Sequence, residues 1–125
     1  MKKVLAASVA LVMVSGLAWA GLQSNREVQV NLTAGTASGS VYDARVSTDT
    51  VQYIGCMIYG SAGAAPAVFC DARNSQSERV NCSSIDSAIF AIAQGISTDS
   101  FISFSCDEDG RIKSLVVSKL SVWVP

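Results

Sequence analysis

The chain has 125 residues, half of them hydrophobic, with nine basic side chains against ten acidic ones and no histidine. This charge balance disfavours nucleic acid or an anionic membrane as the main partner, because both require a basic footprint. The lack of histidine removes the usual general base of serine and cysteine hydrolases and the commonest zinc ligand. It therefore excludes conventional catalytic triads and histidine-based metal sites.

Residues 1–20 have the pattern of a cleavable export signal. A basic head at residues 2–3 precedes an apolar run over 4–17 that is too short to span a bilayer comfortably, and small residues occupy positions 18 and 20. We expect cleavage before Gly21 and no lipid anchor, because no cysteine follows the cleavage site. The compact head is typical of bacteria. Cleavage leaves a chain of net charge −3, secreted or periplasmic, with no further segment that could insert into a membrane.

After the signal, the sequence predicts a strand, a linker and a globular domain. Polar and apolar residues alternate over 26–33, as in a half-buried strand, and residues 34–40 are all Ala, Gly, Ser or Thr. We therefore assign 21–40 to an N-terminal strand and a flexible Gly/Ser/Thr linker, and 41–125 to a disulfide-stapled globular domain. Short apolar segments between turn residues predict the first four strands of that domain, at 41–47, 51–59, 67–73 and 78–83.

A single helix interrupts the strands. Apolar side chains recur at three- and four-residue steps from Ile85 to Ile96, the spacing of one helix face, which predicts a helix over about 84–94. One of the two preceding serines can cap its start, and Gly95 can end it.

The chain closes with a predicted hairpin. Two strands, 100–106 and 112–124, are joined by an acidic turn in which Gly110 is expected to take a positive φ. The expected fold class is α+β: an antiparallel sheet of five to seven strands with one helix packed across it.

All four cysteines, Cys56, Cys70, Cys82 and Cys106, follow the export signal. An even count in a small exported domain predicts two disulfides, each stabilising the fold by about 3 kcal/mol through restriction of the unfolded chain. The alternative, a four-thiolate metal site, normally shows two close cysteine pairs, whereas the gaps here are 14, 12 and 24 residues. We expect neither a metal nor another cofactor.

The cysteines also predict the strand register. Hairpins folded about residues 63 and 76 place Cys56 opposite Cys70 and Cys70 opposite Cys82. Alternation then turns all four sulfurs toward one apolar layer, which the helix is expected to cover. We favour the pairing Cys70–Cys82 with Cys56–Cys106, whose long closure ties the terminal hairpin to the central sheet. The pairing Cys56–Cys70 with Cys82–Cys106 fits the row as well.

The same register defines the opposite face of these strands. Tyr53 lies beside Arg73 at one end, Met57 lies beside Phe69 at the other, and Gly55 makes a dip between them. An aromatic ring next to arginine, with hydrogen-bonding groups around it, is a reasonable recognition surface. The candidate binding residues are Tyr53, Met57, Phe69, Asp71, Arg73, Arg79 and Asn81. In the alternative interpretation, the apolar pair is a second core covered by the N-terminal strands, and the Tyr53–Arg73 pair is an ordinary cross-strand contact.

No group of residues predicts catalysis, so we assign no catalytic residue. The carboxylates at 107–109 lie at an exposed hairpin tip, without the spacing of a calcium loop or the buried cleft that a glycosidase acid requires. The leading hypothesis is an exported, non-enzymatic binding or structural module that contacts a protein or a cell-surface glycan through its sheet face or loops. The alternatives are a secreted hydrolase inhibitor that presents the loop 60–66, and a small histidine-free hydrolase built on Lys113 or Lys119.

Overall fold

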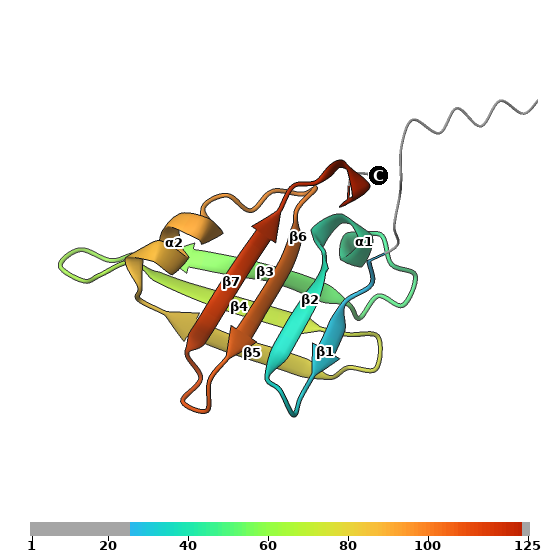
Figure 1. Ribbon diagram of the computed structural model, residues 1–125, viewed down its shortest axis with the longest axis horizontal. Coiled ribbons are helices and arrows are strands. Elements are labelled where there is room, and N and C mark those ends of the chain that lie inside the picture. The colour runs from blue at the N-terminus through green and yellow to red at the C-terminus, as the bar shows by residue number, and fades with distance from the viewer. Residues whose placement is uncertain (1–25, 124–125) are drawn as a thin grey trace, which may run out of the picture.

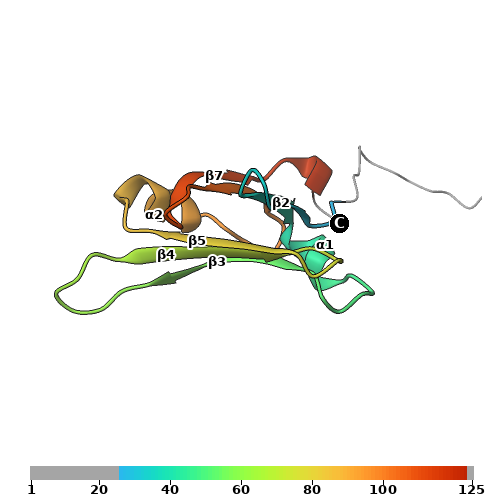
Figure 2. The ribbon, with the colours of Figure 1, turned by 90° about the horizontal axis from the view of Figure 1, so that it is seen from below.

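Two antiparallel sheets lie face to face in the computed structural model, which describes residues 26–123 (Figure 1, Figure 2). The four-stranded sheet has the order β1-β2-β6-β7, and the three-stranded sheet has the order β3-β4-β5. The predicted export signal lies outside the described residues. The elements are β1 (Gln29–Asn31), β2 (Thr36–Ser40), α1 (Val41–Arg45), β3 (Tyr53–Tyr59), β4 (Ala67–Arg73), β5 (Arg79–Ser84), α2 (Ser87–Ala93), β6 (Phe101–Cys106), β7 (Ile112–Ser118) and the 3-10 helix η1 (Ser121–Trp123).

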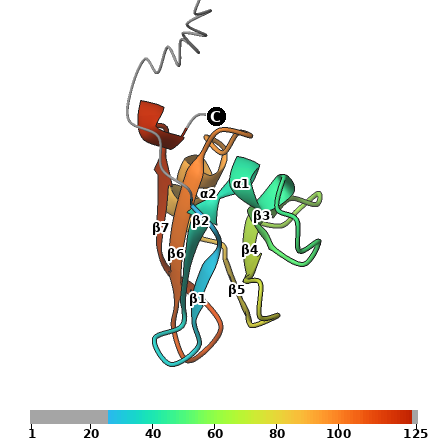
Figure 3. The same cartoon turned by 90° about the vertical axis from the view of Figure 1, so that its right-hand side faces the viewer.

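Apolar side chains from both sheets fill the space between the layers, which Figure 3 shows edge-on. Strand alternation turns one side of each sheet inward and leaves the other side outward. The buried core residues of the four-stranded sheet include Ala37, Ile102, Phe104 and Leu115, and those of the three-stranded sheet are Ile54, Val68, Cys70, Ala72, Val80 and Cys82. No helix between residues 26 and 123 is long and apolar enough to cross a membrane.

The predicted antiparallel strands and two disulfides are confirmed, but the single sheet covered by one helix is wrong. The strands divide into two layers, and α2 packs beside β7 at one end of the sandwich, where it also touches β3 and β4 (Figure 2). The physical reason is that α2 is too short to cover the sheet. A helix of seven residues extends only about 10 Å, too little to cover a broad sheet, whereas a second sheet covers most of the inward side of the strands.

The predicted helix is present as α2, with a different N-cap. The side chain of Asp86 accepts hydrogen bonds from the backbone N–H groups of Ala88 (2.8 Å) and Ile89 (3.2 Å). The expected serine caps are not available, because β5 continues to Ser84.

Two N-terminal segments differ from the prediction. Most of the expected linker is β2, and the expected strand at 41–47 contains α1. The small residues of β2 reflect close packing, since a Cβ on Gly39 would lie 3.0 Å from the Cα of Val28. Ser40 then ends the strand and caps α1, because its side chain accepts a hydrogen bond from the N–H of Asp43 (3.1 Å).

The outer strands are shorter than predicted. β1 covers only the middle of the expected strand at 26–33, because a tight turn follows in which Gly35 has φ +67°. β7 ends at Ser118, and the chain then turns into η1, which brings Trp123 back onto Phe101 at a ring distance of 4.2 Å. This aromatic contact closes the C-terminal end of the described chain over β6.

The disulfides join Cys56 to Cys70 and Cys82 to Cys106, so the favoured pairing is wrong and the other pairing is correct. Cys56 lies directly opposite Cys70 in the β3–β4 hairpin, with 4.0 Å between their Cα atoms. Because Cys70 is bonded to Cys56, it cannot form a disulfide with Cys82. The side chain of Cys82 points from its own sheet toward Cys106 on β6. The Cα atoms of Cys82 and Cys106 are 5.8 Å apart. The second bridge therefore links the two sheets.

A buried glutamine also joins the layers. Oε1 of Gln52 accepts a hydrogen bond from the backbone N–H of Val28 (2.8 Å), and Nε2 of Gln52 donates to Asp49. Asp49 also accepts from the backbone N–H groups of Val51 (2.8 Å) and Gln52 (2.9 Å). These bonds lower the pKa of Asp49, and the side-chain bond from Gln52 is the largest cause.

The two disulfides are expected to contribute similar stability. Replacing Cys56 and Cys70 together with Ala, or Cys82 and Cys106 together, should lower the free energy of unfolding by about 3 kcal/mol in each case, because the closed loops are of similar length. Urea unfolding measures the loss, and non-reducing peptide mapping checks the pairs. A fragment that joins Cys70 to Cys82 would contradict the structure.

Two aspartates should make the free energy of unfolding depend on pH. The pKa of Asp49 is lowered as described, and the pKa of Asp99 is lowered chiefly by the hydrogen bond from the Ser97 side chain. A carboxyl with a lower pKa in the folded state stabilises the fold above its unfolded pKa of about 3.9, and this contribution is lost as pH falls through the folded pKa. The urea midpoint should therefore drop in acid, and less so in a variant carrying Asp49→Asn and Asp99→Asn. Equal acid sensitivity of the two proteins would refute this assignment.

Candidate functional site

The outward side of the three-stranded sheet is the candidate site, and we call it the outer face. It comprises Tyr53, Gly55, Met57 and Tyr59 from β3, Ala67, Phe69, Asp71 and Arg73 from β4, and Arg79, Asn81 and Ser83 from β5. Figure 2 shows this sheet as the lowest layer, with the four-stranded sheet and α2 on its other side.

The predicted register of the outer face is confirmed. Tyr53 pairs with Arg73, and Met57 pairs with Phe69. On the other side of β4, Asn81 lies opposite Asp71, and Arg79 lies opposite Arg73. All seven candidate residues therefore lie on one surface.

The alternative of a second core is wrong for the described residues. Met57 is 57% exposed and Tyr53 is 37% exposed. A layer packed over these side chains would bury them. The N-terminal strands that were expected to cover them belong to the four-stranded sheet on the inner side. The outer face is open to solvent.

An ion pair organises the centre of the outer face. Arg79 donates from Nε to Oδ1 of Asp71 (2.9 Å) and from Nη2 to Oδ2 (2.6 Å), and the hydroxyl of Tyr53 donates to Oδ1 (3.3 Å). The hydrogen bonds and charge of Asp71 raise the pKa of Arg79. Asp71 also offsets the repulsion between two arginines that lie directly opposite each other.

Arg73 has no such anionic partner. The only salt bridge in the described part of the chain is the one between Arg79 and Asp71. The Cζ atom of Arg73 lies 5.9 Å from the centre of the Tyr53 ring, within the range of a cation–π contact. Its Nε atom is buried without a hydrogen-bond partner. One cation on the outer face is therefore held in place but not neutralised by the described chain.

Gly55 leaves a dip between the two ends of the outer face. A Cβ placed on it would meet no atom within 4 Å. Glycine in a strand costs about 0.5–1 kcal/mol relative to alanine. Neither crowding nor a positive φ requires it at this position.

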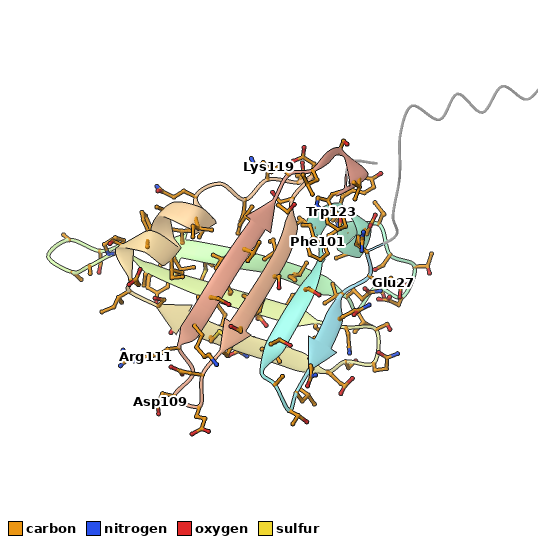
Figure 4. All side chains as sticks on the ribbon, in the orientation of Figure 1. Glu27, Phe101, Asp109, Arg111, Lys119 and Trp123 are labelled. Carbon is orange, nitrogen blue, oxygen red and sulfur yellow. A yellow bond between two sulfur atoms is a disulfide. The ribbon has the colours of Figure 1, made fainter. Side chains whose placement is uncertain are left out.

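The acidic turn has a structural role. Oδ1 of Asp107 accepts hydrogen bonds from the N–H groups of Asp109 and Arg111, both at 2.9 Å, and Gly110 takes the predicted positive φ of +74°. Figure 4 shows Asp109 and Arg111 at this tip, far from Phe101 and Trp123 at the other end of the same hairpin. Between residues 26 and 123, no three acidic, cysteine or histidine side chains gather closely enough to hold a metal ion.

Two features escaped the sequence analysis. Tyr59 shares the outer face and is 53% exposed, and the two-residue period of β3 could have revealed it. Arg26 lies over the Trp123 ring, 3.9 Å from Cζ to the ring centre, on the stack that Trp123 forms with Phe101. No sequence signal joins residues so far apart in the chain.

Comparison with models of known protein families found no match, and neither did comparisons with curated proteins and with solved structures. The function must therefore be inferred from the outer face itself.

The two sides of β3 should respond differently to mutation. Ile54→Ala removes an inward side chain that is 7% exposed and should cost about 2–5 kcal/mol, whereas Met57→Ala removes an outward one and should change stability by less than about 0.5 kcal/mol. Urea unfolding of both variants measures the difference. Similar losses would mean that the outer face is covered.

Proposed function

We propose that this chain is an exported, non-enzymatic binding module that recognises another protein through its outer face. The observation that carries the proposal is an uncovered sheet face made of residue types that protein interfaces favour. Tyrosine, phenylalanine, methionine and arginine are enriched in such interfaces, whereas lysine, glutamate, aspartate, serine and alanine are depleted. The outer face contains all four favoured types and neither lysine nor glutamate; its members of the depleted types are Ala67, Asp71 and Ser83.

The outward side of the four-stranded sheet provides the contrast. Over most of its area, the two central strands present Thr36, Ser38, Ser103 and Ser105, and β7 adds Ser114 and Val116. Phe101, at one end of β6, is the aromatic exception, and its ring is stacked against Trp123 of the same chain. Short hydroxyl side chains offer little apolar area to a partner, and aromatic and arginine anchors usually supply most of the binding energy. The two outward surfaces of one sandwich therefore differ in chemistry, and this difference favours the outer face.

Rigidity supports the same interpretation. The Cys56–Cys70 bridge lies directly behind the outer face, and the Tyr53 hydroxyl and Arg79 fix the Asp71 carboxylate. A surface whose side chains are already ordered loses less entropy on binding. Two disulfides are also typical of an oxidising compartment, which agrees with the proposed export to the periplasm or beyond the cell.

A hydrolase inhibitor is the second candidate, because the β3–β4 loop projects beyond the rest of the sandwich (Figure 2). Residues 60–66 are all exposed. Glycine, alanine and serine dominate this loop and make poor anchors, so we rank it second. Inhibition of an extracellular protease or glycosidase that is lost when the loop is shortened would establish this role instead.

Site-specific crosslinking in the native cell tests the proposal. A photoreactive amino acid in place of Met57 should give a discrete crosslinked protein, because the partner contacts the outer face. The matched control replaces Val116, which is 55% exposed on the other sheet against 57% for Met57. Replacing Tyr53 and Arg73 with Ala should abolish the product and leave the fold intact. Identical products from both positions, or none from position 57, would refute the proposal.

A further inference from the structure

We infer that the partner presents an extended acidic segment whose backbone passes over Gly55 and whose carboxylate pairs with Arg73. This inference rests on the proposed function and specifies the chemistry of the partner. Two separate observations on the outer face lead to it: a glycine without an internal role and an arginine without an anion.

Gly55 has no structural need to be glycine. The other strand glycine, Gly39, is required because a Cβ there would lie 3.0 Å from the backbone of Val28. Glycines at turns, such as Gly63 (φ +80°), are required by their positive φ. At Gly55 a Cβ would meet open space, although a side chain would strengthen the strand. Glycine in a strand is also found where another backbone approaches closely, and that explanation applies here.

Arg73 supplies the charge requirement. Asp71, the nearest acidic residue on the outer face, is bound through both oxygens by Arg79. The outer face therefore carries one cation in excess, although residues 21–125 have a net charge of −3. A carboxylate of the partner could accept hydrogen bonds from the guanidinium of Arg73, while the Tyr53 ring packs against that guanidinium.

The spacing of the rows defines the segment. The Tyr53–Arg73, Gly55–Asp71 and Met57–Phe69 pairs follow one another at two-residue steps, about 7 Å each. An extended peptide has the same step between side chains on one side. If an acidic residue of the peptide pairs with Arg73, the peptide residue four positions away lies at Met57 and Phe69, where an apolar side chain is favoured. The peptide residue halfway between these two crosses the dip at Gly55.

The combined requirements of the outer face favour a polypeptide over an acidic glycan. The ligand must provide one carboxylate at Arg73, a close approach to Gly55, and an apolar group two rows beyond Arg73. An extended peptide supplies all three in a fixed spacing, and its backbone is thin enough to use the dip. Binding of an acidic polysaccharide, with no acidic peptide selected, would therefore contradict the inference.

A displayed library of random linear peptides is the probe, and the exported protein is the target. Selection should enrich peptides with Asp or Glu four positions from an aliphatic or aromatic residue. Arg73→Gln should weaken binding of a selected peptide at least tenfold and remove the preference for acid, and Arg73→Lys should retain part of it. Gly55→Val should weaken binding at least tenfold without lowering the melting temperature, because the added side chain fills only the dip. Val116→Ala is the neutral control.

The outcomes separate this inference from the proposed function. If Met57→Ala weakens binding but Gly55→Val and Arg73→Gln do not, the outer face binds and the acidic segment is wrong. If none of the three has an effect, the proposed function fails as well. Absence of any enriched peptide, or enrichment without acidic residues, overturns the inference. Gly55→Ala is a smaller probe of the premise, and a lower melting temperature for this variant would contradict it.

Discussion

The direct opposition of Cys56 and Cys70 across two strands is the constraint on which the rest of the structure depends. Side chains alternate along a strand, so a slip of one residue would exchange the two faces of the sheet. The bridge prevents such a slip, because after a shift of one residue the two sulfurs would point to opposite faces of the sheet and could not bond. Cys82 continues the row on β5 and is fixed in turn by its bond to Cys106 on the other sheet.

This constraint produces the outer face as well as the core. Once the sulfurs point inward, Tyr53, Gly55 and Met57 must point outward, and the four-stranded sheet already occupies the inner side. Apolar surface on β3 thus stays in contact with water in the described structure. Such exposure is unfavourable for an isolated domain and is explained if a partner covers it. The ion pair of Arg79 with Asp71 then leaves Arg73 as the charge available to the proposed partner.

The strands near the cysteines could be predicted because local alternation and the cysteine row agree there. The layers could not, because the pairing of β2 with β6 joins residues more than sixty positions apart and leaves no local signal. Small residues in β2 resembled a linker, although they are needed for close packing against Val28. Both disulfide pairings fitted the row, and only the position of the second sheet decides between them. The seven candidate binding residues followed from the register, although Tyr59 on the same face was missed. The bidentate ion pair depends on side-chain conformations that no pattern encodes.

Whether the outer face is open in solution can be measured directly at Met57. Met57 is the only methionine in residues 21–125, and its oxidation by hydrogen peroxide depends on exposure. The folded protein should add one oxygen atom at Met57, assigned by peptide mapping, at nearly the rate measured after denaturation. Oxidation that becomes fast only in denaturant would show that Met57 is buried, and the outer face would then be part of a core.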